Sequence, residues 1–555
     1  MIGDGNSMAF CENCGAKLTC GVRFCEECGA EVSVSAISEG IADMGILSHQ
    51  GAADPFELAL CLFQSSEWQR LWSAFADASV GSELGIIVTR EKEILHQIGD
   101  VETGAFRKIL LDYIAKATER NVRYAYCDLD GCTFHKGGGK AENVVASLRR
   151  IVEVARPKYL FILGNEDVID VVRWENLAKD GDEVVESDLC YSTLDVNTPF
   201  GGQVYDFDEV MRVGRLPSRK GEGLESYSRY FKNAFQSIGT GQGVRPYGLS
   251  ALEWEGMSNY EYNHISEDKV DVSPAVTTKD VGERIHDETN LLFFNLHGSN
   301  DAEFWYGQSG SSYPEAFAPN VLDGRDNLYF IGVEACYGAR YLGGLDVGSS
   351  VMLMAMRNKC LAFLGASRIA FGAIKPEVFC PEGSCADVVI GDYIRCLVEG
   401  SSAGDAHIEG LRHLSAKHEG MNDSEIKTLA EFALYGDPAA RMPTSKNTSG
   451  AHKCVKSSGV ARGLFVPQPD VRRSVQMALA EVDSKIEALV DEFVMHNLLP
   501  EVLETGLDAV RQSVFKMTNT GLNQKRYSLD VGPISRIAKV YFDDNGKIHE
   551  ALVSK

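Results

Sequence analysis

The strongest constraint on the fold is a repeated alternation of short apolar runs with amphipathic helical patterns in the middle of the chain. Apolar residues recur at helical spacing over Phe106–Thr118, and Ala141–Ala155 behaves in the same way. The apolar runs are Leu84–Val88, Val122–Cys127, Tyr159–Leu163, Leu291–Leu296 and Leu328–Val333, with another beginning near Leu361. This alternation predicts an α/β domain with a largely parallel sheet flanked by helices.

The chain divides into several parts, because 555 residues exceed what one hydrophobic core can hold. The α/β pattern belongs to a main domain over residues 56–443. Before it, residues 1–33 carry paired cysteines, and residues 34–55 are small and polar, as in a linker. After it, residues 444–465 are polar and basic, as in a second linker. Residues 466–555 combine a helical pattern with an Asn-Gly hairpin, which predicts a small C-terminal α+β domain.

Two CxxCG knuckles near the N-terminus predict a structural zinc site. Cys11 and Cys14 form the first pair, and Cys25 and Cys28 form the second. Two such turns hold four thiolates tetrahedrally around Zn²⁺, and four protein ligands leave no position open for catalysis. The segment resembles a bacterial zinc ribbon, a module that docks on protein or nucleic acid. Two disulfides are the alternative, which a reducing compartment disfavours.

Charge and cysteine content indicate the surroundings in which such a chain works. A formal charge of −25 at pH 7 argues against binding of nucleic acid or anionic membranes by the chain as a whole. No apolar run approaches the ~20 residues of a membrane span, and the first residues lack the pattern of a secretory signal. Fifteen cysteines without such a signal lead us to expect reduced thiols in a bacterial cytosol.

Two of the apolar runs end in residues that carry chemistry. His297 follows Leu291–Leu296, and Cys336 follows Leu328–Val333. Reactive residues gather at the carboxyl ends of parallel strands, so a thiol nucleophile and a histidine that moves its proton would meet there. Gly298 has no Cβ, so its amide can approach an oxyanion beside the amide of Cys336. The alternative is a buried histidine and a packed thiol.

Around these residues the sequence resembles the caspase-like cysteine peptidases of clan CD. A strand followed by His-Gly, and a later strand followed by Ala-Cys-x-Gly, are typical of that clan. Three further stretches resemble its gingipain-type branch: Pro157–Asn165, Val213–Arg219 with a Gly-Arg-Leu-Pro motif, and Leu434–Pro438 with a Gly-Asp-Pro motif. The Glu-Ala-Cys triplet that begins at Glu334 is similar to legumains. The resemblance spans about Phe56–Pro443 and implies a caspase/gingipain-like sheet.

The resemblance also implies an endopeptidase with a Cys336–His297 dyad and a dominant pocket for P1, the residue before the scissile bond. In members that prefer Arg or Lys at P1, a pocket acid pairs with the substrate cation. Asp188 is the matching residue here, although a carboxylate that caps a turn is an equal reading. Glu166, just past the run that ends at Leu163, is the candidate that orients His297. It departs from the Gly-Asp that the family has at that point.

Together these features predict a cytosolic cysteine endopeptidase tethered to a zinc ribbon, with no cofactor needed for catalysis. We expect protein or peptide substrates, and regulation by an activator or partner that docks on the ribbon or the C-terminal domain. A catalytically degenerate scaffold with the same fold is one alternative, and a nucleic-acid adaptor that binds through its ribbon is another. In the C-terminal domain, apolar residues at helical spacing predict a helix over Val471–Asn497.

Overall fold

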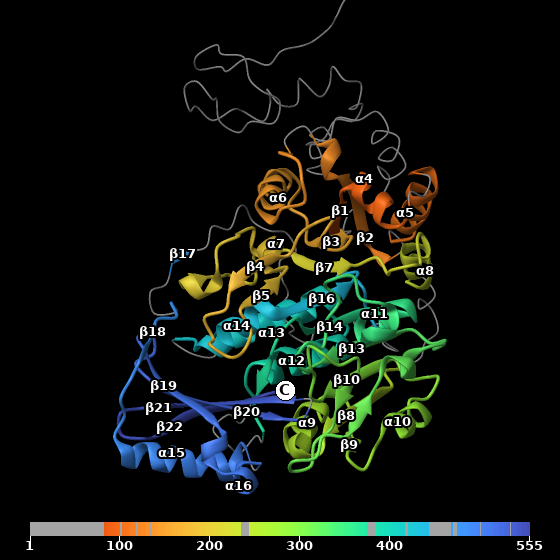
Figure 1. The fold of residues 1–555 in the computed structure, drawn as a ribbon. Helices are drawn as coiled ribbons and strands as arrows, with labels where there is room; N and C mark the ends of the chain where they lie inside the picture. The colour runs from red at the N-terminus through yellow and green to blue at the C-terminus, as the bar shows by residue number, and fades with distance from the viewer. Residues whose placement is uncertain are drawn as a thin grey trace, which may run out of the picture.

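The fold is described from a computed structural model of the chain, drawn as a ribbon in Figure 1. The structure describes residues 83–99, 103–117, 120–132, 135–234, 243–374, 383–416, 420–442, 468–469, 474–499, 501–532 and 534–555. The four cysteines expected to bind zinc and the two expected linkers lie outside these residues. Within the described part, no helix has the length and apolar character needed to span a membrane.

A ten-stranded sheet forms the centre of the main domain, in the order β2-β1-β3-β7-β16-β14-β13-β10-β8-β9 (Figure 1). Its strands are β1 (Glu83–Thr89), β2 (Val122–Asp128), β3 (Tyr159–Leu163), β7 (Arg212–Leu216), β8 (Pro246–Ala251), β9 (Asp271–Ser273), β10 (Leu291–Asn295), β13 (Tyr329–Val333), β14 (Cys360–Ala366) and β16 (Phe432–Gly436). Every neighbouring pair is parallel except β14 and β16, which are antiparallel. The largely parallel sheet is therefore confirmed, as two parallel halves that run in opposite directions.

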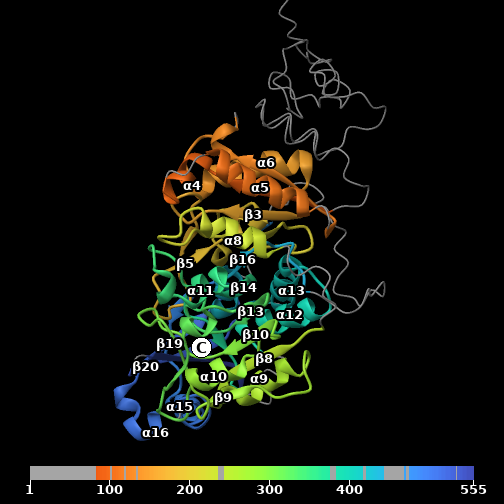
Figure 2. The same cartoon turned by 90° about the vertical axis from the view of Figure 1, so that its right-hand side faces the viewer.

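Helices cover this sheet, which explains why its strands consist of apolar runs rather than alternating patterns. The helices are α4 (Glu91–Gln97), α5 (Thr103–Ala117), α6 (Ala141–Ala155), α7 (Leu189–Thr193), α8 (Glu225–Asn233), α9 (Glu255–Tyr262), α10 (Thr278–Arg284), α11 (Val351–Arg357), α12 (Ala386–Val398), α13 (Ala403–Ala416) and α14 (Asp423–Glu431). Helix α8 packs between α5 and α11, as Figure 2 shows, while α12 and α13 pack on each other and against the central strands. Every residue of β3, β7, β10, β13, β14 and β16 is buried.

The C-terminal residues form a second, antiparallel sheet in the order β15-β22-β21-β20-β19-β18. Its strands are β15 (Phe371–Gly372), β18 (Met477–Leu479), β19 (Arg511–Met517), β20 (Asn523–Val531), β21 (Ile534–Phe542) and β22 (Ile548–Ser554), and α15 (Ser484–Asn497) and α16 (Val502–Thr505) accompany them. The expected hairpin is present between β21 and β22. The predicted helix over Val471–Asn497 is shorter than expected, because Met477–Leu479 pairs with β19 as a strand instead.

The second sheet includes one strand, β15, that belongs to the main domain. β15 pairs with β22, and the side chains of Leu552 and Tyr541 pack with Phe371 and Cys336 in one apolar cluster. Figure 1 shows the blue C-terminal sheet lying beside the green second half of the main sheet. The C-terminal domain, residues 474–555, is thus docked at the edge where β10 and β13 end.

Candidate active site

The two residues predicted to carry the chemistry lie at the same edge of the main sheet. His297 comes just after β10 and Cys336 just after β13, and these strands are parallel neighbours. The turns that follow them touch through their backbones: a Cβ added to Gly298 would lie 1.7 Å from the main-chain oxygen of Cys336. Only glycine fits at that point, so the sequence His-Gly is needed to bring the histidine turn against the cysteine turn.

His297 is fully buried and its ring is held by Gln308. The Nε2 atom of His297 lies 2.7 Å from Oε1 of Gln308. The amide nitrogen of Gln308 donates to the carbonyl of Gly310 and to Glu501, so its oxygen faces the ring. Nε2 therefore carries the proton and donates it, which leaves the lone pair on Nδ1. Among the described residues, Nδ1 has no hydrogen-bond partner.

The environment of His297 favours the neutral imidazole. The ring packs on the indole of Trp254, with 4.2 Å between centroids. Burial lowers the pKa of His297 well below its ordinary value, and the positive charges of Arg536 and Lys555 lower it further. A neutral ring with a free Nδ1 is the form that can accept a proton.

Cys336 is held as a protonated thiol in this arrangement. Its pKa is raised to about 12, chiefly by burial and to a lesser extent by the charge of Glu431, while the hydrogen bond to Ala370 and the charge of Lys427 oppose the rise. Its Sγ atom lies 3.5 Å from the carbonyl oxygen of Ala370. No hydrogen bond joins it to His297 among the residues described.

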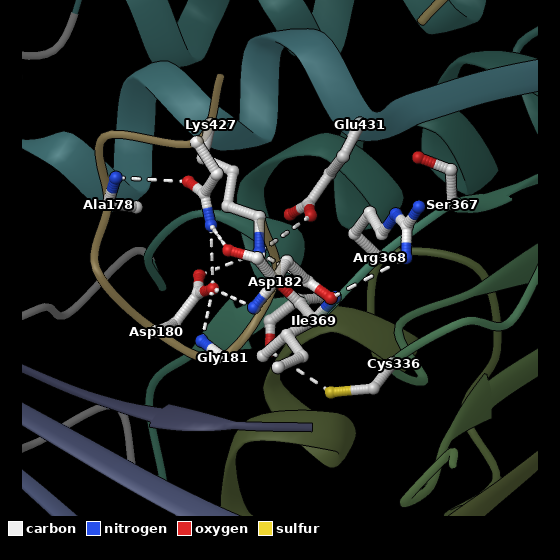
Figure 3. Close-up of polar contacts among 12 residues, drawn as sticks. Ala178, Asp180, Gly181, Asp182, Cys336, Ser367, Arg368, Ile369, Lys427 and Glu431 are labelled. Atoms are coloured by element: carbon white, nitrogen blue, oxygen red, sulfur yellow. Dashed lines mark hydrogen bonds and ion pairs between the residues drawn. The ribbon is translucent and has the colours of Figure 1, made fainter. Parts of the chain in front are cut away.

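A buried polar network lies behind the thiol (Figure 3). The ammonium of Lys427 on α14 lies 2.6 Å from Asp180 Oδ2 and 2.7 Å from Asp182 Oδ2. Asp182 in turn accepts hydrogen bonds from the amide of Ile369 at 2.9 Å and from the hydroxyl of Tyr337 at 2.6 Å. The network thereby fixes both the segment that leads into β15 and the residue after Cys336.

Three buried carboxylates form an acidic pocket beside the thiol. They are Glu261 on α9, Glu334 two residues before Cys336, and Asp387 on α12, all less than 4% exposed. Their oxygens lie within 4.8 Å of one another, a spacing that would also suit a metal ion. Burial raises the pKa of Glu334 to about 7. It also raises that of Glu261 well above its ordinary value, with the charges of Glu334 and Asp387 adding to it.

The side chain of Lys555 fills this acidic pocket. Its ammonium lies 3.1 Å from Glu334 Oε2 and 2.9 Å from Asp387 Oδ1, and 4.6 Å from the centre of the Trp254 ring. The carboxylates raise the pKa of Lys555 although burial opposes them. A Cβ added to Gly372 would lie 2.2 Å from Lys555 Cε. A larger residue at position 372 would have to displace the Lys555 side chain from its present position.

The backbone of the same residue reaches the dyad. The main-chain oxygen of Lys555 accepts a hydrogen bond from the amide of Cys336 at 3.2 Å, and its own amide donates to Ala370 at 2.9 Å. Val553 and Ser554 continue as an antiparallel pair with β15. The extended segment thus places the main-chain oxygen of Lys555 at the amide of Cys336 and its ammonium in the acidic pocket.

Two residues expected at the site have other partners. Both oxygens of Asp188 are held by the buried guanidinium of Arg215, at 2.8 and 2.6 Å. Arg215 already neutralises this carboxylate, so Asp188 offers no free acid here, although it lines a cavity together with Tyr337 and Arg340. Glu166 accepts a hydrogen bond from the amide of Gly343, and the residue that holds the ring of His297 is Gln308.

Among the residues that the sequence analysis did not identify, Glu334 could have been found from the sequence, since it lies on the same turn as Cys336. Glu261, Gln308 and Asp387 carry no such signal.

A family of known proteins matches the main domain. The model of peptidase family C25 matches residues 101–443, a range that includes His297, Cys336 and the three buried carboxylates. No curated protein matches the sequence. A solved structure titled "Structure of Protease" aligns with 87% of this chain and 100% of its own chain, at 10% sequence identity and a TM-score of 0.40.

Proposed function

Since the chain belongs to peptidase family C25, the gingipain family of caspase-like enzymes, it is a cysteine peptidase, and we propose that it is an endopeptidase that cleaves after lysine. Cys336 is the nucleophile in this proposal, and His297 is the base and acid. The supporting observation is the position of Lys555, whose ammonium lies between Glu334 and Asp387 while its main-chain oxygen faces the amide of Cys336.

The proposed reaction proceeds through an acyl-enzyme. With a substrate carbonyl in the position of the Lys555 oxygen, Sγ of Cys336 attacks the carbonyl carbon as Nδ1 of His297 takes the thiol proton. The amides of Cys336 and Gly298 donate to the oxyanion. The C–N bond breaks as His297 protonates the leaving amine. Water, deprotonated by His297, then attacks the thioester, and the carboxyl product leaves as the thiol regains its proton.

The proposed preference for lysine follows from the negative charge of the acidic pocket and from the length of the lysine side chain. Glu261, Glu334 and Asp387 are buried together, so an incoming cation relieves their mutual repulsion, whereas an acidic P1 residue would be rejected. Trp254 adds a cation–π contact at one wall. The lysine ammonium reaches two of the carboxylates at ion-pair distance, so we rank lysine above arginine.

The test is hydrolysis of a fluorogenic peptide library that varies only at P1. We expect cleavage after lysine by Lys555→Ala, in which the acidic pocket is vacated, and none when Cys336→Ala or His297→Ala is added to it. Glu334→Gln should lower kcat/KM for lysine far more than for leucine. Cleavage that prefers another P1 class would reject the acidic pocket as the specificity pocket. If neither the wild-type chain nor Lys555→Ala cleaves, and a lysyl acyloxymethyl ketone leaves Cys336 unlabelled in both, the degenerate scaffold is the better function.

Two further expectations rest on the sequence alone and remain proposals. Cys11, Cys14, Cys25 and Cys28 would hold one structural Zn²⁺, and the chain would work in the cytosol. Zinc content of the purified protein, measured before and after substitution of Cys25 and Cys28 by serine, tests the first. Fractionation of cells that express the tagged chain tests the second.

A further inference from the structure

We propose that residues 548–555 are a built-in, substrate-like occupant of the peptidase cleft, which keeps the enzyme closed until the C-terminal domain lifts away. The inference rests on the proposed function, because it takes the acidic pocket as the pocket for P1. It goes beyond that function by assigning an inhibitory role to a named segment of the chain. Four features of the structure carry it.

The first is the backbone. A peptide substrate needs an extended strand along the edge of the cleft, because added strands bind through main-chain hydrogen bonds. The segment meets this requirement: Ser554 pairs with Phe371 and Val553 with Gly372, and the Lys555 amide donates to Ala370. The carbonyl that would be attacked in a substrate is represented by the Lys555 oxygen at the Cys336 amide.

The second is the side chain in the pocket. Lys555 is 1% exposed and forms ion pairs with Glu334 and Asp387, and these two side chains are themselves fully buried. A buried carboxylate cluster without a cation is strongly destabilised, so the pocket holds a lysine tightly whether it comes from this chain or from a substrate. The two cannot occupy the pocket together.

The third feature is another contact made by the C-terminal domain, with the residue that holds the ring of His297. Glu501 of the C-terminal domain accepts a hydrogen bond from Gln308, the residue that orients His297, at 2.9 Å. Arg536 lies 3.4 Å from Glu501 and donates to the main chain of Ser554 at 2.9 Å. One domain thus covers both His297 and Cys336, which are 0% and 4% exposed.

The fourth is that the domain can separate without unravelling. β22 pairs with β15 through only two residue pairs, whereas its pairing with β21 runs along most of the hairpin. The rest of the junction combines the apolar cluster around Phe371 and Leu552 with polar contacts, in which Lys539 reaches Asp423 at 2.8 Å and the carbonyl of Ala178 at 2.7 Å. Polar contacts of this kind are typical of interfaces between domains that move relative to each other.

The first experiment measures the rate at which iodoacetamide alkylates Cys336 in the full-length protein, by mass spectrometry. Lys555→Glu adds a fourth carboxylate to the pocket, so we expect this rate to rise at least about tenfold. Lys555→Arg keeps the cation and should stay near the wild-type rate. Lys547→Glu, on the exposed β21–β22 turn, is the matched control, and the core thiols Cys190 and Cys360 are internal references.

If Lys555→Glu impairs folding by circular dichroism, Lys555→Ala removes the cation without adding charge and gives the same comparison. An unchanged alkylation rate in a folded Lys555→Glu or Lys555→Ala protein overturns the inference. So does an equal rise in Lys547→Glu.

In the second experiment, residues 548–555 are added in trans as a separate peptide. A synthetic peptide of residues 548–555, added to the Lys555→Glu protein, should protect Cys336 from alkylation, and the same peptide with Lys555→Glu should not. The tethered segment acts at an effective concentration on the order of 1 mM, so the peptide is tested up to that concentration. Equal protection by both peptides, or by neither, overturns the inference.

Alkylation does not depend on catalysis, so the two proposals fail in different ways. If Lys555→Glu exposes Cys336 but no variant cleaves any peptide, the proposal that residues 548–555 occupy the cleft is supported. The proposal that the chain is an endopeptidase is then rejected. If the wild type and Lys555→Glu cleave lysyl peptides equally, with equal alkylation, the endopeptidase remains supported and the occupant is rejected.

Discussion

His297 donates from Nε2 to the side-chain oxygen of Gln308 across 2.7 Å, and this fixes the tautomer with its lone pair on Nδ1. We predict that Gln308→Leu lowers kcat by about 10- to 100-fold with little change in KM, since the ring is misoriented while the P1 pocket is intact. Gln512→Leu, at an exposed position of β19, is the control for loss of an amide. A fall confined to KM would contradict a positioning role for Gln308.

The acidic pocket makes a separate prediction about substrate choice. Asp387→Asn and Glu334→Gln each leave a buried lysine with one charged partner fewer, so kcat/KM for a lysyl peptide should fall by about 10- to 100-fold. A leucyl peptide, which makes no ion pair, should lose much less. Steady-state kinetics on the two peptides measure the ratio, and Glu267→Gln, on an exposed loop, is the control. Equal losses on both peptides would indicate damage to the dyad instead.

Gly372 should control entry to that pocket. An added Cβ would lie 2.2 Å from Lys555 Cε and 2.5 Å from Asp387 Oδ1, so Gly372→Ala should exclude the lysine side chain. We expect Cys336 to be alkylated faster in this variant while lysyl peptides are cleaved more slowly. Gly348→Ala, where an added Cβ meets nothing within 4 Å, should change neither rate. Normal lysine cleavage in Gly372→Ala would place the P1 side chain elsewhere.

Stability against acid should depend on His407, a buried residue of α13. Burial lowers its pKa to about 4, whereas the unfolded chain has an ordinary histidine near 6.5. As the pH falls from about 6.5 to about 4, only the unfolded state takes up this proton, so the free energy of unfolding falls, by about 3 kcal/mol for this group.

The pH dependence is measured by urea unfolding at pH 7 and at pH 4. His407→Gln removes this titration, so its free energy of unfolding should fall by less between the two pH values than that of the wild type. His286→Gln, in an exposed loop, is the matched control and should follow the wild type. A parallel decline in His407→Gln and the wild type would contradict the prediction.

Lys427 should be a major contributor to stability. It is fully buried between Asp180 and Asp182, and its loss leaves buried carboxylates uncompensated, which destabilises a protein by about 3–5 kcal/mol. We expect Lys427→Met to lower the urea midpoint accordingly, with Lys485→Met, at an exposed position of α15, as the control. A change below about 0.5 kcal/mol would mean that the network is neutral in this chain.

The sequence was informative where a local pattern decides the structure. Apolar runs defined β10 and β13, and with them the position of His297 and Cys336, because parallel strands present their carboxyl ends at one edge. Sequence could not decide pairing between distant residues. Asp188 looks like a free loop carboxylate until β7 brings Arg215 against it.

The acidic pocket was missed for the same physical reason. Glu261, Glu334 and Asp387 come from three separate elements, and each alone is typical of an ordinary helix or turn. Only the packing of α12 against both β13 and α9 makes them neighbours. The sequence predicts helix at Met477–Leu479, which is a strand, because apolar residues in so short a segment fit the helical and the strand period equally well. Its partner β19 lies further along the chain.

The pairing of β15 with β22 joins an early and a late part of the chain, and this has a consequence for biosynthesis. Ribosomes add about 5–20 residues per second, and domains fold as they emerge. Cys336, His297 and the acidic pocket are therefore complete for many seconds before β22 has been made. Under the proposed inhibition, each nascent chain would pass through an interval in which residues 548–555 do not yet fill the cleft, and restraint in that interval would have to come from slow folding or from another molecule.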